Sequence, residues 1–245
     1  MITFTDLQEG VYDLNIFKAF FLAGGPGSGK SYVVQRTTGG LGMKVINSDD
    51  IFEKMLDDEL GTQDLRDIDP TVRDEIRGRA KALTKKKKEN YVEGRLGLII
   101  DGTGKDYDKI VRQATQLKQL GYDVHMIFVN TSLEVALIRN EKRDRTVPES
   151  VAIRSWNAVQ RNIGKFSQYF RQGFVVVDNN DEQEDDGMIF NNVFKQIKRL
   201  ANKKPTSKIA MAWIANELEK KKQTSAMRSR LTVTMSYEPD GKMLQ

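Results

Sequence analysis

Residues 24–31 form a glycine-rich segment whose spacing suits the binding of nucleotide phosphates. The eight positions are Gly24, Gly25, Pro26, Gly27, Ser28, Gly29, Lys30 and Ser31. Glycines adopt backbone conformations barred to other residues, so successive N–H groups can surround phosphate oxygens at the start of a helix. The pattern G-x-x-x-x-G-K-S after an apolar run predicts that Lys30 reaches the β and γ phosphates of ATP and that Ser31 ligates Mg²⁺. A glycine turn without a ligand is the alternative, and the complete motif disfavours it.

Carboxylates that suit phosphoryl transfer follow two other apolar runs. Asp101 directly follows residues 96–100, where we expect it beside the glycine-rich loop and in the Mg²⁺ shell, with a turn or helix cap as the alternative. Asp49 and Asp50 follow residues 43–48, on a strand expected next to the same loop. A hydroxyl that attacks a phosphoryl group loses a proton, and we assign the general base to Asp49. We expect one of the two to cap a helix over residues 51–56; capping alone would be the alternative role for both.

Two arginines lie four residues apart on a predicted helix. Arg139 and Arg143 share one helical face, and their planar guanidinium groups suit the charge that develops on a transferring phosphoryl group. The alternative is a solvated helix in which Glu141 and Asp144 balance them. The segment that follows, to Arg171, is a candidate lid over the nucleotide.

Five short apolar runs must position these side chains. They predict strands over residues 18–23, 43–48, 96–100, 122–129 and 174–178, which alternate with segments of helical periodicity. Such alternation predicts an α/β fold, a three-layer parallel sheet of about five strands. The long insertion over residues 51–95 contains a charged helix from Thr71 to Glu93 and is either an acceptor-binding element or a solvated cap. We place a catalytic domain at residues 1–202.

The composition separates this domain from a basic tail. The 245 residues include 39 Lys and Arg against 34 Asp and Glu, and the whole excess lies after residue 200. We therefore expect residues 203–245 to form a helical or flexible tail, with an amphipathic helix over residues 208–222 and a poorly structured end. The absence of cysteine excludes thiolate and disulfide chemistry. No apolar run approaches membrane-spanning length, so we expect a cytoplasmic protein without a membrane partner.

Three further features have modest significance. The lysine run at residues 85–88 either holds an anionic acceptor or forms a solvated face. His125 lies within a predicted core strand, where a structural, hydrogen-bonded histidine is expected. Trp156 and Trp213 are assigned to packing.

The ordered set of motifs resembles the P-loop kinases that include bacteriophage-type polynucleotide 5′-kinases and zeta-toxin-like kinases. The similarity extends from about residue 20 to residue 180 and rests on segments 24–31, 47–50, 101–103, 121–124, 139–143 and 147–148. The resemblance implies that Asp49 activates the acceptor hydroxyl, that Arg143 is a transition-state arginine, that Arg139 contacts phosphate and that Asn179 lies at the adenine. One departure is Phe52, where related kinases often carry an arginine that faces the acceptor's phosphate. Lys54 or a basic residue of the following helices is expected in its place.

These observations predict an ATP- and Mg²⁺-dependent phosphotransferase that acts on a hydroxyl group. A polynucleotide 5′-hydroxyl is the favoured acceptor, because the motif order is closer to those kinases. The first alternative is a small phosphorylated metabolite such as a nucleotide sugar. The second is a nucleotide-binding interaction module without catalysis, and a motor ATPase ranks last. Deletion of residues 203–245 is expected to spare phosphoryl transfer, and the partner of the tail is left open.

Overall fold

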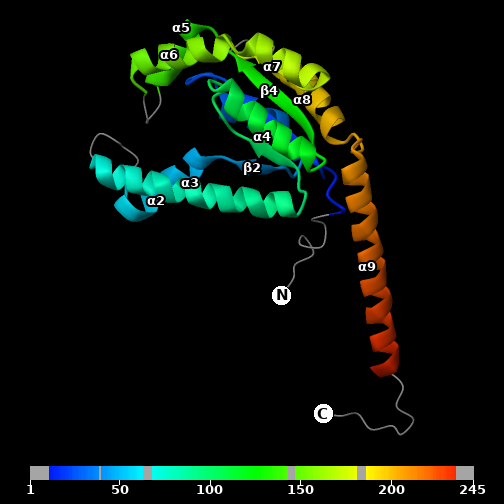
Figure 1. The fold of residues 1–245 in the computed structure, drawn as a ribbon. Helices are drawn as coiled ribbons and strands as arrows, with labels where there is room; N and C mark the ends of the chain where they lie inside the picture. Colours follow the sequence, from blue (N-terminus) through cyan, green and yellow to red (C-terminus); the bar gives the residue numbers. More distant parts are fainter. Residues whose placement is uncertain (1–10, 39, 63–67, 143–146, 181–185, 236–245) are drawn as a thin grey trace.

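A computed structural model describes residues 11–38, 40–62, 68–142, 147–180 and 186–235 (Figure 1). Its centre is a parallel sheet in the order β2-β3-β1-β4-β5. The strands are β1 (Lys18–Ala23), β2 (Lys44–Ile46), β3 (Leu98–Ile100), β4 (Asp123–Asn130) and β5 (Phe174–Asp178). The first and last strands have the predicted bounds, and the α/β fold is confirmed. The strand β2 is a sheet edge and β3 separates it from β1, so the expectation that residues 49–50 follow a strand next to the glycine-rich loop was wrong.

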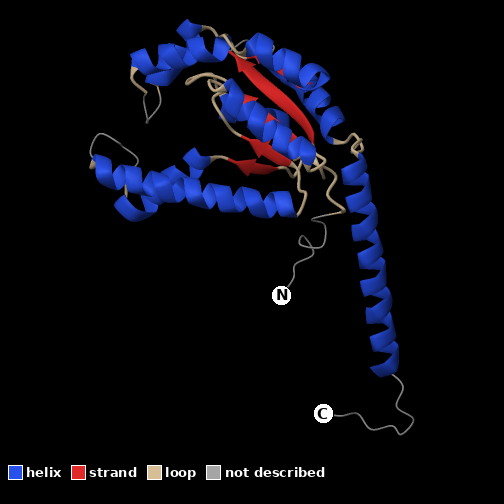
Figure 2. Cartoon of the chain, viewed as in Figure 1, coloured by secondary structure: helices blue, strands red, loops and turns tan. Residues whose placement is uncertain are grey.

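Helices cover both faces of the sheet, which gives the predicted three layers (Figure 2). All six residues of β1 are buried, and alternate side chains enter opposite layers: Phe21 packs with α4 (Tyr107–Gln119) and α7 (Ile163–Phe170), whereas Phe20 packs with α1 (Lys30–Thr38) and α8 (Asp186–Ala201). A central parallel strand has to be apolar on both sides for this reason. The chain also forms α5 (Leu133–Glu141), α6 (Glu149–Gln160) and a 3-10 turn, η1 (Arg171–Gly173).

The insertion between β2 and β3 forms a helical hairpin with a core of its own. It consists of α2 (Ser48–Leu60) and α3 (Pro70–Glu93), which lie side by side (Figure 1). Its buried residues are Phe52, Leu56, Ile68, Ile76 and Ala80. The side chain of Asn47 caps α2 by accepting a hydrogen bond from the backbone N–H of Asp49. The predictions that Asp49 or Asp50 caps this helix and that it begins at residue 51 were therefore wrong.

The helix α9 (Lys208–Met235) begins against the sheet and then extends away from it (Figure 1). Ala210 is fully buried, and the Trp213 ring meets the Phe17 ring edge-on with 5.5 Å between centroids. Ile214 packs on the same core. The helix continues past residue 222, so the prediction of a poorly structured end was wrong as far as residue 235. Because Ala210, Trp213 and Ile214 belong to the core, we propose that the domain boundary lies after Ile214, not at residue 202.

His125 on β4 packs as predicted but lacks the expected hydrogen bonds. Its ring lies 4.8 Å from the Phe20 ring between centroids, and neither ring nitrogen has a hydrogen-bond partner in the described part of the chain. Burial, together with the nearby charge of Lys18, lowers the pKa of His125 to about 4. The imidazole is therefore neutral near pH 7. Over the described residues, no helix is long and apolar enough to cross a membrane.

Candidate active site

The glycine-rich loop connects the end of β1 to the start of α1 and is packed too tightly for side chains. Gly27 and Gly29 have φ values of 74° and 78°, which glycine adopts without strain. A Cβ on Gly27 would lie 2.0 Å from the carbonyl oxygen of Ala136, so α5 closes one side of the loop. A Cβ on Gly24 would lie 2.6 Å from the Ser28 hydroxyl oxygen, whose buried atom has no hydrogen-bond partner among the described residues. The loop thus forms a cradle of backbone groups at a helix N-terminus, as phosphate binding requires.

Lys30 and Arg139 both lie at this loop. The Lys30 ammonium donates hydrogen bonds to the carbonyl oxygens of Gly24, at 2.8 Å, and Gly25, at 3.2 Å. Arg139 donates to the carbonyl oxygen of Asn179 at 2.6 Å, and its guanidinium lies 3.9 Å from the Cβ position of Gly29. Both cations are therefore beside the position expected for the phosphates.

Asn179, which follows β5, forms a hydrogen bond with the glycine-rich loop. Its buried side chain donates a 2.8 Å hydrogen bond to the carbonyl oxygen of Ser28. Because the Asn179 amide is buried against the loop and its backbone carbonyl binds Arg139, we propose that Asn179 positions the loop and Arg139. This role was missed from the sequence, because residues 28 and 179 meet only in the folded chain.

Asp101 follows β3 directly, and one oxygen of its carboxylate is unusual. Its Oδ1 atom is buried without a hydrogen-bond partner in the part of the chain that the structure describes. Burial raises the pKa of the Asp101 carboxyl, and the positive charge of Lys30 opposes this shift. An orphaned carboxylate oxygen near Lys30, with the hydroxyl of Ser31 in the first turn of α1, is a donor set that fits Mg²⁺. The described residues contain no cluster of three acidic or histidine side chains for a metal ion, so such an ion would depend on phosphate oxygens as well.

Asp49 lies in the first turn of α2 and is held by a residue of α3. Its Oδ1 accepts a hydrogen bond of 3.2 Å from the Arg77 guanidinium, which also lies 5.0 Å from the Phe52 ring centroid. Phe52 itself is 1% exposed and belongs to the hairpin core. An arginine of α3 thus reaches the carboxylate, whereas the expected basic residue that faces the acceptor's phosphate stays a prediction.

Asp50 differs from its neighbour in its surroundings. Burial raises the pKa of its carboxyl, and the negative charges of Asp101 and Asp49 raise it further. The charge of Asp49 also contributes to the raised pKa of Asp101. The three carboxylates and Lys30 are therefore close enough to interact, although β2 and β1 are not adjacent strands.

The candidate lid contacts the loop through Trp156 of α6. This indole packs over Gly25, whose Cβ position lies 3.6 Å from the ring, and it donates a 2.8 Å hydrogen bond to the carbonyl oxygen of Thr131. The buried side chain of Asn140 binds the backbone N–H and carbonyl of Val147 and so joins the end of α5 to the start of α6. The predicted catalytic residue Arg143 belongs to the connection between them and lies outside the described residues. The hydrogen-bonding roles of Trp156 and Asn140 were not predicted from the sequence.

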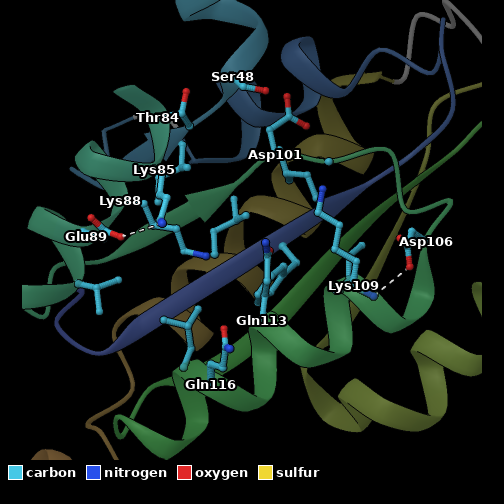
Figure 3. Close-up of a pocket in the computed structure, with 18 of the residues that line it drawn as sticks. Ser48, Thr84, Lys85, Lys88, Glu89, Asp101, Asp106, Lys109, Gln113 and Gln116 are labelled. Carbon is cyan, nitrogen blue, oxygen red and sulfur yellow. Dashed lines mark hydrogen bonds and ion pairs between the residues drawn. The ribbon is translucent and has the colours of Figure 1, made fainter. Parts of the chain in front are cut away.

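A cavity of about 940 Å³ lies between α3, α4 and the sheet (Figure 3). Ser48, Asp101 and Thr103 line it where the carboxyl ends of the strands meet. Lys88 lines it from α3, and Lys109 lines it from α4. The cavity therefore reaches the predicted metal ligand Asp101 and is large enough for an acceptor.

The parallel sheet, the glycine-rich loop and the carboxylate after β3 define a P-loop kinase fold. The sequence profile of the Zeta toxin family matches residues 16–186, and the chain belongs to this family. A solved AvrRxo1-ORF1:-ORF2 structure with ATP is similar with a TM-score of 0.56 and 14% identity over 81% of this chain and 79% of that chain. The native AvrRxo1-ORF1:-ORF2 complex gives a TM-score of 0.54 and 15% identity over 81% and 78%. A gluconokinase from Sinorhizobium meliloti 1021 gives 0.46 and 17% over 76% and 95%. No curated protein matches the chain significantly.

Proposed function

We propose that the protein is an ATP- and Mg²⁺-dependent phosphotransferase that moves the γ-phosphoryl group of ATP to a hydroxyl group. The observation that carries this proposal is the glycine-rich cradle with Lys30 bound to it, beside a buried Asp101 oxygen that has no hydrogen-bond partner among the described residues and that lines a cavity for an acceptor. The kinase fold and the family are consistent with it.

Each group has a role in the proposed reaction. The backbone of residues 24–31 and the Lys30 ammonium bind the triphosphate, and Ser31 and Asp101 hold Mg²⁺. When bound, the ion would neutralise negative charge on the phosphate oxygens. The acceptor oxygen forms a bond to the γ phosphorus while the bond from that phosphorus to the oxygen of ADP breaks, and the hydroxyl proton passes to Asp49. Arg139 stabilises the charge on the transferring group, and we assign the same role to Arg143.

The Arg77 guanidinium gives Asp49 a fixed orientation. A charged hydrogen bond restricts the orientation of a carboxylate, which suits a base that must accept a proton from a hydroxyl at one position. The bonds from the Lys30 ammonium to the carbonyl oxygens of Gly24 and Gly25 hold this side chain at the loop where the phosphates are expected.

Two acceptor classes were predicted, and the cavity bears on the choice. A polynucleotide 5′-hydroxyl stays a candidate on motif order alone. The cavity between α3 and α4 has the volume of a small-molecule site, and this favours a small phosphorylated compound as the acceptor.

Incubation with γ-labelled ATP, Mg²⁺ and a panel of acceptors tests the proposal. The panel contains 5′-hydroxyl oligonucleotides, nucleosides, sugar phosphates and nucleotide sugars. We expect label in one class, and loss of that label in the Lys30→Ala variant. ATP binding without transfer to any member would support the interaction-module alternative instead.

A further inference from the structure

The lysine run on α3 contains three exposed residues and one half-buried residue, and two of the four, Lys85 and Lys88, line the cavity. Lys85, Lys86 and Lys87 are exposed, whereas Lys88 is half-buried at the cavity wall. Lys85 forms an ion pair of 3.9 Å with Glu89 one turn further on. A purely solvated face would leave all four ammonium groups in water, so Lys88 needs a separate explanation.

Lys88 faces a second cation across the cavity. Figure 3 shows Lys88 extending from α3 toward Gln113 of α4, with Lys109 on the same helix reaching toward the Asp101 end. Burial lowers the pKa of Lys88, and the positive charge of Lys109 lowers it further. Lys88 and Lys109 thus line one cavity as two like charges, and an anion bound between them would offset their repulsion.

The acidic side chains of the cavity do not supply that anion. Glu89 pairs with Lys85, and Asp106 caps α4 by accepting a hydrogen bond from the backbone N–H of Lys109. The charge of Lys30 acts on Asp101, whose buried Oδ1 has no hydrogen-bond partner among the described residues. Within the described residues, no carboxylate forms an ion pair or hydrogen bond with the ammonium group of Lys88 or Lys109.

We propose that Lys88 and Lys109, with the Gln113 amide between them, bind a phosphate group of a small acceptor that lies in this cavity. The inference rests on the proposed phosphotransferase function and adds the group by which the acceptor is held. A phosphate accepts charge-assisted hydrogen bonds from both ammonium groups, which a neutral ligand cannot do. A compound anchored there extends along the cavity, and its hydroxyl lies at the end lined by Ser48 and Asp101.

The test measures phosphate binding without turnover. The full-length protein is saturated with Mg²⁺ and a non-hydrolysable ATP analogue, so that the P-loop is filled, and is titrated with inorganic phosphate at constant ionic strength by calorimetry. We expect Lys88→Gln and Lys109→Gln to weaken phosphate binding about 10- to 100-fold while analogue binding is unchanged. Lys86→Gln removes the same charge from an exposed position of the same run and is expected to bind phosphate like the wild type. Equal affinities in all four proteins, or no phosphate binding in the wild type, would overturn the site.

A stability measurement checks the same site by a different route. Lys88→Met keeps the length of the side chain and removes the charge, so it is expected to raise the thermal midpoint of the ligand-free protein. Phosphate is expected to raise the midpoint of the wild type and not that of Lys88→Met. A phosphate effect of equal size in both proteins would refute the assignment.

Two further arms separate the possible sources of phosphate. A hexose phosphate and a 5′-hydroxyl oligonucleotide replace inorganic phosphate in the same titration. Lys88-dependent binding of the hexose phosphate supports a small acceptor, and Lys88-dependent binding of the oligonucleotide alone overturns it. If transfer occurs but no phosphate binding depends on Lys88, the phosphate site is refuted and the proposed function stands. If Lys88-dependent binding occurs without transfer to any acceptor, the phosphate site stands and the proposed function is refuted.

Discussion

Trp213→Ala is expected to destabilise the whole domain, because the first turns of α9 form part of its core. The indole is partly buried and meets Phe17, which is 0% exposed, edge-on at 5.5 Å. Truncation of a buried tryptophan costs about 3–5 kcal/mol, and partial burial brings this to about 2–3 kcal/mol, of which the aromatic pair contributes about 0.5–1.5 kcal/mol. For a chain of this length we expect the melting temperature to fall by about 4–12 °C.

Thermal and urea unfolding of Trp213→Ala measure this effect, with Met211→Ala as the control. Met211 lies two residues away on the same helix and is 51% exposed, so its truncation is expected to change stability by less than about 0.5 kcal/mol. Removal of residues 225–245 is expected to leave stability and transfer intact. Removal of residues 203–245 is expected to impair both, which revises the expectation from sequence. Equal stability of Trp213→Ala and Met211→Ala would refute the assignment of Trp213 to the core. Wild-type stability after removal of residues 203–245 would refute it as well.

Three further predictions concern the loop, the hairpin and the sheet. Gly27→Ala is expected to weaken ATP binding about 100-fold, because the new Cβ meets the α5 backbone. Gly40 has a similar φ of 78° and open space around its Cβ position, so Gly40→Ala is expected to leave ATP binding unchanged. Titration with an ATP analogue compares the two variants. Arg77→Gln loses the ion pair with Asp49 and is expected to slow transfer about 10- to 100-fold. Arg79→Gln loses the ion pair with Glu59, which joins the same two helices, and is expected to slow transfer about twofold or less. Steady-state transfer rates measure both effects. The pKa of His125 is about 4 in the folded protein and about 6.5 in the unfolded chain, so the unfolded chain binds more protons between these pH values. The free energy of unfolding therefore rises with pH by up to about 1.4 kcal/mol per pH unit in this range. Urea unfolding from pH 4 to pH 7 should show a smaller slope in His125→Phe. Indistinguishable members of any pair would contradict the corresponding prediction.

The central strands were predictable from sequence because strands buried on both faces consist of short, mainly apolar runs of residues. Every residue of β1 is buried, and the five apolar residues that follow Lys18, directly before a glycine-rich turn, have few other interpretations. The edge strand β2 was predicted too long, because an edge needs fewer ladder hydrogen bonds and only Ile46 of its three residues is buried. The start of α2 was misplaced because Asn47, Asp49 and Asp50 are all good capping residues, and local preference does not choose among them.

The candidate site was predictable only in its local parts. The P-loop and Asp101 are contiguous with their strands, so motif and position sufficed. The contact of Arg77 with Asp49 depends on how α3 packs against α2, which the charge pattern of a polar helix does not determine. The same holds for Asn179, which is 151 residues from its partner Ser28, and for Lys88, which only the folded helix distinguishes from the three lysines before it.

The most direct test of the account compares Asp49→Asn with Asp50→Asn once an acceptor is known. Single-turnover transfer from labelled ATP is measured beside the affinity for a non-hydrolysable analogue. We predict that Asp49→Asn lowers the transfer rate about 10²- to 10⁴-fold with nearly unchanged analogue affinity, and that Asp50→Asn affects transfer far less. Transfer at the wild-type rate in Asp49→Asn, or loss of transfer and analogue binding together, would contradict the assignment of Asp49 as the general base.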